Sequence, residues 1–215
     1  MKLRLADGIR APRPDEYPAG TDVAKIDALR AAARIIPGYR LRSETNDRFF
    51  AEVNVDADRL WEAFEALAFV LPEPVSGIVG FKDDDPMFSE YADKAPVLAA
   101  LYSFRDELCH DGFLAFGAIH QTATQNEEVF VTSTKYLRVW GADLAAFRET
   151  MTRLELAEVP DLAFVDELPV VSESLRVIRG ETARHHEQVI AEVRSRFDAL
   201  TPWTEAIAKK GPALH

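Results

Sequence analysis

Residues 113–121 limit the fold more than any other segment, because they are apolar on both of the alternating sets that a strand presents. A strand with two apolar faces must lie in the interior of a covered sheet. Polar residues 122–127 follow, and residues 128–132 and 136–140 again have strand character. Connections this short join antiparallel neighbours, so the sequence predicts an interior strand, a hairpin and a third strand beside it.

Helical periodicity alternates with strand patterns on both sides of this hairpin. Residues 49–55 and 75–81 are predicted strands that flank a helix, and a second helix is predicted over 96–109. A third helix begins after Asp143, and residues 162–165 are predicted as the last strand. We therefore predict an α+β fold with a largely antiparallel sheet and helices packed on it. Its two strand–helix–strand units are comparable to a ferredoxin-like duplication.

Proline, glycine and charge divide the chain into three predicted parts. Residues 1–45 form an N-terminal extension with one amphipathic helix over 22–35, bounded by proline-containing turns. Residues 46–170 form the acidic α+β core. Residues 171–215 form a C-terminal helical segment that packs on the core and that Gly180 divides into two pieces.

The acidic residues are concentrated in the middle of the sequence. The chain has 25 Lys and Arg against 36 Asp and Glu, which gives a net charge of −11. Residues 46–170 alone carry nine basic and 24 acidic side chains, a net charge of −15. A phosphate backbone is held by basic surfaces, so this distribution argues against nucleic acid as a partner. It favours either simple solubility or a basic protein partner that is attracted over long range.

Other bulk features point to a cytoplasmic protein. No apolar run approaches the roughly 18 residues that span a bilayer, so no membrane partner is expected. The first seven residues contain basic side chains, but no apolar stretch typical of a signal peptide follows them. Cys109 is the single cysteine, which excludes an intramolecular disulfide and fits a reducing compartment.

Motifs for metals, cofactors and catalysis are absent from the sequence. It has no glycine-rich phosphate loop and no nucleophile elbow, so no cofactor is predicted. His185 and His186 are neighbours on a predicted helix and diverge, and neither has a second histidine at the spacing that zinc sites use. Cys109 and His110 diverge in the same way. No metal site and no catalytic residue is predicted, and the balance is against an enzyme.

One group of residues nevertheless suggests a pocket. His120 ends the interior strand in register with Leu114, Phe116 and Ala118, where a polar group either finds a hydrogen-bond partner or lines a cavity. Aromatic and basic side chains on the nearby third strand could share that cavity. The alternative pocket consists of His120, Tyr136, Arg138 and Trp140.

Three functions remain open at this stage. The leading hypothesis is a non-catalytic protein that binds a basic partner through its acidic core, of the type represented by bacterial immunity proteins that inhibit a basic toxin. Its predicted binding residues are acids of two loops with nearby aromatic anchors: Asp83, Asp84, Asp85, Phe88, Tyr91, Glu127 and Glu128. The alternatives are a small enzyme or ligand-binding domain that uses the pocket around His120, and a structural homodimer.

Overall fold

The structure is a computed structural model that describes residues 2–44, 48–82 and 84–203. Within these residues a seven-stranded sheet has the order β2-β3-β8-β7-β6-β4-β5, and all neighbouring strands are antiparallel. The strands are β2 (Gly38–Glu44), β3 (Phe49–Asn54), β4 (Ser76–Phe81), β5 (Met87–Phe88), β6 (Leu114–Gln121), β7 (Asn126–Val131) and β8 (Leu137–Gly141). The predicted α+β class, with an interior strand over residues 114–121, is confirmed.

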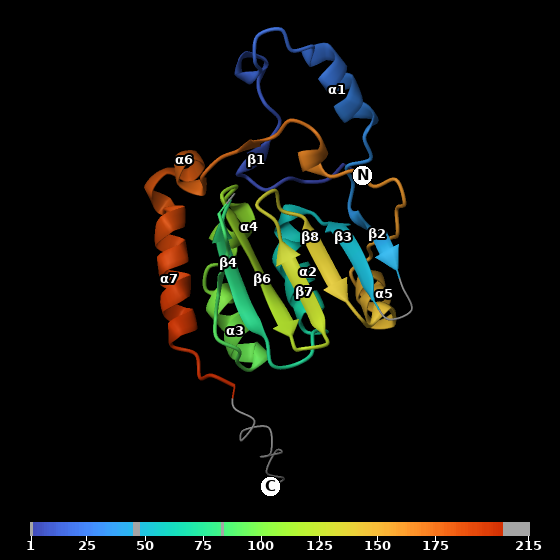
Figure 1. Ribbon diagram of the computed structural model, residues 1–215. Helices are drawn as coiled ribbons and strands as arrows, with labels where there is room; N and C mark the ends of the chain where they lie inside the picture. Colours follow the sequence, from blue (N-terminus) through green and yellow to red (C-terminus); the bar gives the residue numbers. More distant parts are fainter. Residues whose placement is uncertain (1, 45–47, 83, 204–215) are drawn as a thin grey trace.

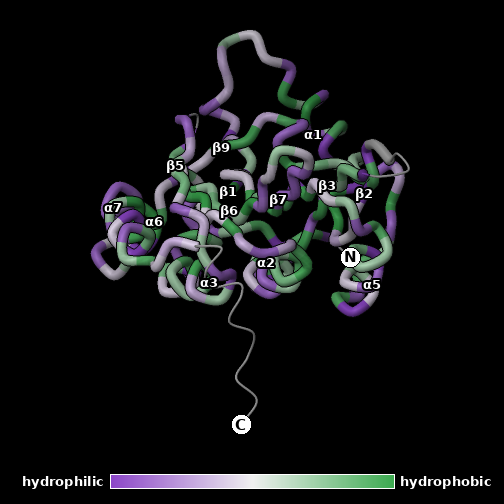
Figure 2. The backbone as a smooth tube through the Cα atoms, turned by 60° about the horizontal axis from the view of Figure 1, so that its bottom comes forward, coloured by the Kyte–Doolittle hydropathy of each residue, from purple (hydrophilic) through white to green (hydrophobic). Residues whose placement is uncertain are grey.

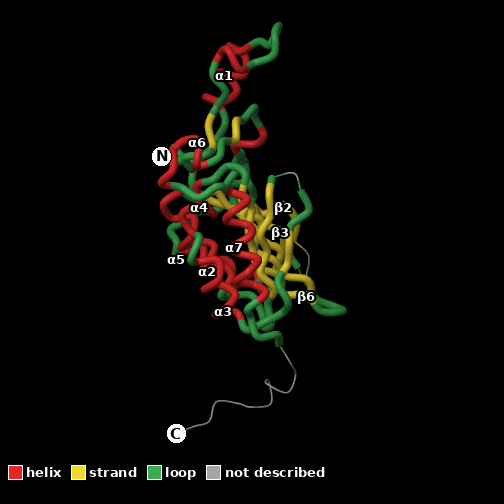
Figure 3. The backbone as a smooth tube through the Cα atoms, turned by 90° about the vertical axis from the view of Figure 1, so that its left-hand side faces the viewer, coloured by secondary structure: helices red, strands yellow, loops and turns green. Residues whose placement is uncertain are grey.

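Helices cover one face of this sheet and, within the described residues, leave the other face without a helix (Figure 3). The covering helices are α2 (Leu60–Ala68), α3 (Lys94–Tyr102), α4 (Arg105–His110), α5 (Leu144–Arg153) and α7 (His186–Asp198). We call the uncovered side the open face; it is turned toward the viewer in Figure 1. Antiparallel sheets commonly have one solvated face, because side chains alternate between the two sides of each strand.

The core lies between the sheet and the helices. Phe64 of α2 and Phe116 of β6 are fully buried, with ring centroids 4.9 Å apart. Along β8, Leu137 and Val139 point into this core, whereas Arg138 between them is exposed. Hydrophobic and hydrophilic stretches both occur along the tube of α2 in Figure 2, and its buried residues include Phe64 and Leu67, as expected for a helix buried along one side.

The terminal segments meet beyond one end of the sheet. Strand β1 (Ile9–Arg10) pairs antiparallel with β9 (Val171–Ser172). Helix α1 (Val23–Ala32) is capped by Asp22, whose carboxylate accepts a hydrogen bond from the Lys25 amide, and it stands away from the sheet (Figure 1). Helix α6 (Leu175–Arg179) ends at Gly180, which has a positive φ of 67°. Short 3-10 helices occupy Pro14–Glu16, Ala57–Arg59, Val165–Glu167 and Gly180–Thr182.

Three local predictions were wrong. Residues 38–44, predicted within the N-terminal extension, form β2 at the edge of the main sheet. The single helix predicted over 96–109 is divided into α3 and α4 near Phe104. Residues 162–165 do not form a strand, because Leu162 and Phe164 pack on Tyr136 in a separate cluster.

The ferredoxin-like comparison is therefore not confirmed. The predicted second unit loses its last strand, and the two strands of the first unit, β3 and β4, are separated in the sheet by β8, β7 and β6. Sequence spacing alone did not reveal how many strands would be inserted between them.

Candidate functional site on the open face

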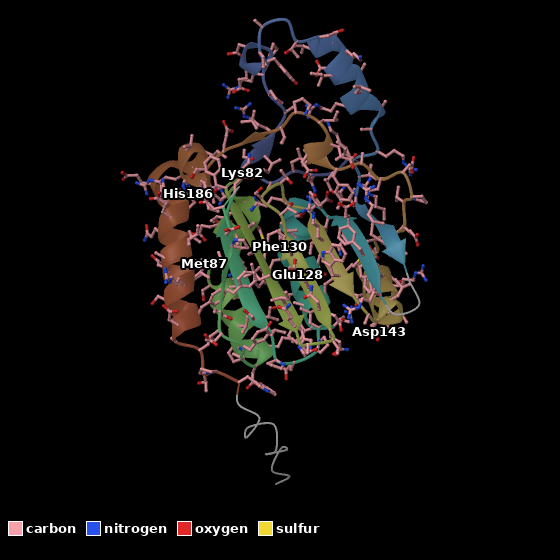
Figure 4. The ribbon with its side chains drawn as sticks, viewed as in Figure 1. Lys82, Met87, Glu128, Phe130, Asp143 and His186 are labelled. Carbon is pink, nitrogen blue, oxygen red and sulfur yellow. The ribbon has the colours of Figure 1, made fainter. Side chains whose placement is uncertain are left out.

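A groove of about 520 Å³ runs across the middle of the open face. Figure 4 shows two of its residues, Glu128 and Phe130, near the centre of the sheet. Six strands and the loop before β5 contribute its lining: Arg42, Phe50, Glu52, Ile78, Pro86, Phe88, Glu128, Phe130, Arg138 and Trp140. The groove thus combines exposed aromatic rings with charges of both signs.

Strand register determines which of these side chains are neighbours. Phe50 pairs with Trp140, and Trp140 pairs with Glu128, so the three form one row across β3, β8 and β7. In the adjacent row, Arg138 lies between Glu52 and Phe130. Directly opposed residues of antiparallel strands are close enough for their side chains to touch. Glu128 therefore has an indole as its cross-strand neighbour.

Aromatic rings form the two sides of the groove. Phe50 and Trp140 are stacked, with ring centroids 4.0 Å apart and an interplanar angle of 17°. Trp140 is 45% exposed, and Phe88 at the far side is 56% exposed. Between them, Phe130 leans over Gly117, where a Cβ atom would approach the ring to 3.1 Å. Glycine at this position lets the Phe130 ring lie low, which leaves space above the strands.

A network of charged groups closes the β2 end of the groove. Glu52 is buried and accepts hydrogen bonds from Arg40 Nε at 3.0 Å and Arg42 Nε at 2.6 Å. Arg40 also donates to Glu167 at 2.6 Å, and its guanidinium lies over the ring of Phe164. Buried charges are tolerated when they are paired in this way. These hydrogen bonds hold the edge of the groove in place, and each of these charged groups has its partner within the network.

Glu128 differs from Glu52 because its carboxylate has no hydrogen bond or ion pair with any described residue. The side chain is half-buried among the groove residues. Burial raises the pKa of its carboxyl group above the usual value, and the positive charge of Arg138 partly opposes that effect. An unpaired, partly desolvated carboxylate is a favourable position for a cation from outside the protein.

Arg138 is turned toward Tyr136 rather than paired with Glu128. Its Nη2 donates to the Tyr136 hydroxyl at 2.6 Å, and its guanidinium lies 5.3 Å from the centre of that ring. Burial raises the pKa of Tyr136 to about 12. Tyr136 therefore remains protonated at neutral pH and is a poor general base, because an efficient base titrates near the working pH.

The groove continues toward the β9 end of the molecule as a second hollow of about 410 Å³. The two hollows share Pro86, Phe130 and Arg138. The second one adds Lys82, whose ammonium group donates to Ser172, and the exposed carboxylate of Asp84. Together they form one elongated surface rather than a closed pocket.

The structure separates the residues of the pocket predicted around His120. Tyr136, Arg138 and Trp140 lie on the open face, as alternate residues of one extended segment. His120 lies on the helix-covered face with Phe116 and Ala118, and its Nδ1 is 2.8 Å from the carbonyl oxygen of Pro74. The imidazole is therefore a buried, hydrogen-bonded group, and the open-face groove does not contain it.

The residues predicted to bind a partner are distributed unevenly. Phe88 and Glu128 line the groove, Asp84 lines its continuation, and Asp85 is exposed nearby. Glu127 points to the other face, is buried, and accepts a hydrogen bond from the Ala142 amide. Tyr91 is half-buried at the end of the sheet, where burial raises its pKa. Asp83 lies outside the described residues.

Sequence reasoning missed several groove residues, namely Arg42, Phe50, Glu52, Ile78 and Phe130. The alternation of side chains along each strand could have indicated which of these residues share a face. Phe50 and Glu52, like Glu128 and Phe130, have the strand spacing that places both on one face. Only the order of the strands, however, shows that these pairs meet.

His185 and His186 have local structural roles. His186 is buried against Phe81 and Phe113, with ring centroids 5.0 and 5.2 Å away. His185 precedes α7, and its ring nitrogen accepts a hydrogen bond from the Glu187 amide. No cluster of three or more potential metal ligands occurs in the part of the chain that the structure describes. Among the same residues, no helix is long and apolar enough to cross a membrane.

Comparison with known proteins gives no family for this chain. No protein-family model, no curated protein and no solved structure matches it. The geometry of the open face is therefore the best guide to the function of this protein.

Proposed function

We propose that this protein is a non-catalytic binding protein that holds a basic partner protein against the open face of its sheet. A lysine or arginine side chain of the partner enters the groove beside Glu128. The observation that carries the proposal is the carboxylate of Glu128, which is partly buried between aromatic rings and has no partner among the described residues.

The chemistry around Glu128 suits a cationic side chain. Its cross-strand neighbour is Trp140, and the ring face of an indole attracts cations. A guanidinium or ammonium group could contact the carboxylate and an aromatic ring at once. The alkyl stem of the same side chain would pack on Phe130 and Ile78.

Exposed aromatic residues around this position support a protein partner. Trp140 and Phe88 lie on either side of the groove and are each about half exposed. Tryptophan and other large aromatic residues dominate the energy of protein interfaces when a partner covers them. The elongated shape of the two joined hollows fits a segment of a chain better than a compact small molecule.

Charge supports a basic partner over an acidic one. The net charge of −11 attracts a cationic protein over long range and accelerates its association. Within the groove, Glu52 is neutralised by Arg40 and Arg42, whereas Glu128 is not paired. An acidic segment at the same position would be repelled by this carboxylate, whose charge Arg138 opposes only in part.

Binding is a better account of this groove than catalysis. The imidazole of His120 is on the other face of the sheet, and Tyr136 has a pKa of about 12. The groove residues therefore offer recognition groups more readily than a proton-transfer pair. An immunity-type inhibitor that neutralises a basic toxin in the cytoplasm is one biological form that such a binding protein could take.

The proposal is tested by locating the binding surface with a defined probe. The probe is a capped peptide of alternating arginine and leucine, and the matched control replaces arginine with glutamate. Amide chemical shifts should change along β3, β7 and β8 with the basic peptide alone, and the changes should decrease at high salt. Shifts confined to the helices, or equal shifts with both peptides, would reject the open face as the site. Concentration-dependent self-association without peptide would favour a homodimer instead.

A further inference from the structure

A separate cavity lies where the N-terminal segment and α1 meet the body of the protein, and it shares no lining residue with the two hollows of the open face. Its volume is about 700 Å³, which is within the range of small-molecule sites. In Figure 1 the N-terminal chain and α1 arch over this end of the molecule. The lining is mainly aliphatic and includes Leu3, Leu5, Ile9, Ile35, Ile36 and Val165.

Helix α1 contributes little that could fill this space. It buries none of its residues, and Leu29 is 52% exposed. Its residues at the cavity are Asp27, Arg30 and Ala31, and Ala33 follows directly after the helix. The small alanine side chains leave the aliphatic wall beneath them open to a ligand.

Cations outnumber anions at the cavity. Lys2, Arg10 and Arg30 line it, and Asp27 is the one acidic residue among the described lining residues. Arg10 is already engaged, because it forms ion pairs with Glu16 at 2.6 Å and Glu173 at 2.8 Å. Lys2 and Arg30 have no carboxylate partner among the described residues.

Arg30 has a donor that the protein does not use. Its Nη2 donates to the carbonyl oxygen of Pro169 at 2.7 Å, which holds the guanidinium in place. Its Nε is buried and has no hydrogen-bond partner among the described residues. A buried donor without an acceptor is unusual in a folded protein. The accessible part of the Arg30 side chain lines the cavity.

We propose that this cavity binds an amphipathic carboxylate, a molecule with a linear alkyl chain that ends in a carboxylate group. The carboxylate forms a charge-assisted ion pair with the accessible part of the Arg30 guanidinium, and Lys2 adds a second positive charge nearby. The alkyl chain packs against Leu3, Ile9 and Ile36. This site is independent of the open face, and neither proposal requires the other.

The test uses three probes that differ only in the head group: decanoate, decanol and decylammonium, each below the concentration at which it aggregates. Calorimetric titration should show decanoate binding at least about tenfold more tightly than decanol, because only the anion satisfies Arg30. Decylammonium should bind more weakly than decanol, since it meets Lys2 and Arg30 with the same sign of charge. Equal affinities for decanoate and decanol would overturn the proposal, and so would no binding of decanoate.

Two variants and a control localise the binding. Arg30→Met keeps the apolar stem and should reduce decanoate binding to the level of decanol. Arg194→Met removes the same charge from an exposed position on α7 and should change nothing. Ala33→Phe fills the cavity and should abolish binding of both probes even if Arg30→Met disturbs α1. If decanoate binds these three variants equally, the site is elsewhere.

Discussion

Phe50 and Trp140 stack across two neighbouring strands, with ring centroids 4.0 Å apart and planes inclined by 17°. The stack holds the indole in place on the open face, beside the unpaired carboxylate of Glu128. A rigid aromatic side chain binds with little loss of entropy, because it is already ordered before the partner arrives. In the proposed function, this stacked pair is therefore an ordered part of the binding surface.

Replacement of this indole should affect binding more than stability. Trp140→Ala removes one stacked pair, so the free energy of unfolding should fall by roughly 0.5–1.5 kcal/mol. Affinity for the arginine–leucine peptide should fall by about tenfold or more, as for an aromatic anchor at an interface. Urea unfolding and calorimetric titration measure the two effects. Unchanged affinity would remove Trp140 from the binding surface.

His120 should show the opposite pattern. His120→Ala leaves the partly buried carbonyl of Pro74 without its partner and removes a buried side chain, and the free energy of unfolding should fall by about 1–3 kcal/mol. Peptide affinity should remain as in the wild type, because the imidazole is on the helix-covered face. If a folded His120→Ala variant loses peptide binding, this result would contradict the open-face site and support a binding role for His120.

Lys135 gives a pH-dependent prediction. It is fully buried, its ammonium group donates to the carbonyl oxygens of Leu108 and Leu114, and burial lowers its pKa to about 8. The unfolded chain holds this proton up to a pKa of about 10.4. Between these two pKa values the unfolded state binds more protons, so this residue makes the protein more stable as pH rises.

Comparison with Lys135→Met isolates that effect. The variant also leaves two buried carbonyls without a donor, which should cost about 1–3 kcal/mol at neutral pH. The difference in unfolding free energy between wild type and variant should then widen from pH 8 to pH 10. A difference that stays constant over this range would show that Lys135 does not titrate there.

The carboxylates beside the groove should act on the rate of association. Asp84 and Asp85 are exposed, so the double change to Asn should alter stability by less than about 0.5 kcal/mol. Association with the basic peptide should become slower and less dependent on salt, because charges at the rim of an interface steer encounter. Stopped-flow measurements at low and high salt test this. An unchanged rate would place the partner away from this loop.

The sequence predicted the fold class because its strongest signals are local. The apolar run that forms β6 and the polar turn before β7 required an interior strand and a hairpin, and both are present. Asp143 caps α5 as expected, with its carboxylate accepting a hydrogen bond from the Ala146 amide. Patterns of this kind depend on periodicity and capping, which act within a few residues.

Features that depend on contacts between distant segments were not predicted from periodicity and capping. The edge strand β2 alternates only over the short run Tyr39, Arg40, Leu41 and Arg42, and its place in the sheet is set by pairing with β3. Leu162 and Phe164 looked like a strand because they are apolar, but they bury Tyr136 instead. The face on which His120 lies relative to Arg138 depends on the registers of β6, β7 and β8 together, and a shift of one residue would reverse it.

The account rests centrally on the carboxylate of Glu128, and Glu128→Gln tests it with nearly unchanged shape. Burial raises the pKa of this group, which means that folding disfavours its ionised form. The cost is fully present above the pKa of the folded state, decreases as pH falls through that pKa, and disappears below the ordinary value near 4.3. The variant should therefore be at least as stable as the wild type at neutral pH, and any loss of binding cannot be attributed to unfolding.

The most direct measurement is the dissociation constant of the arginine–leucine peptide for wild type, Glu128→Gln and Glu149→Gln. Glu149 is exposed on α5, which covers the opposite face, so the control removes the same charge at a distance from the groove. The account predicts that Glu128→Gln weakens binding by about tenfold or more, because a partly desolvated ion pair is lost, whereas Glu149→Gln has little effect. Equal effects of the two changes would mean that only net charge matters, and would contradict the assignment of the open face as the binding surface.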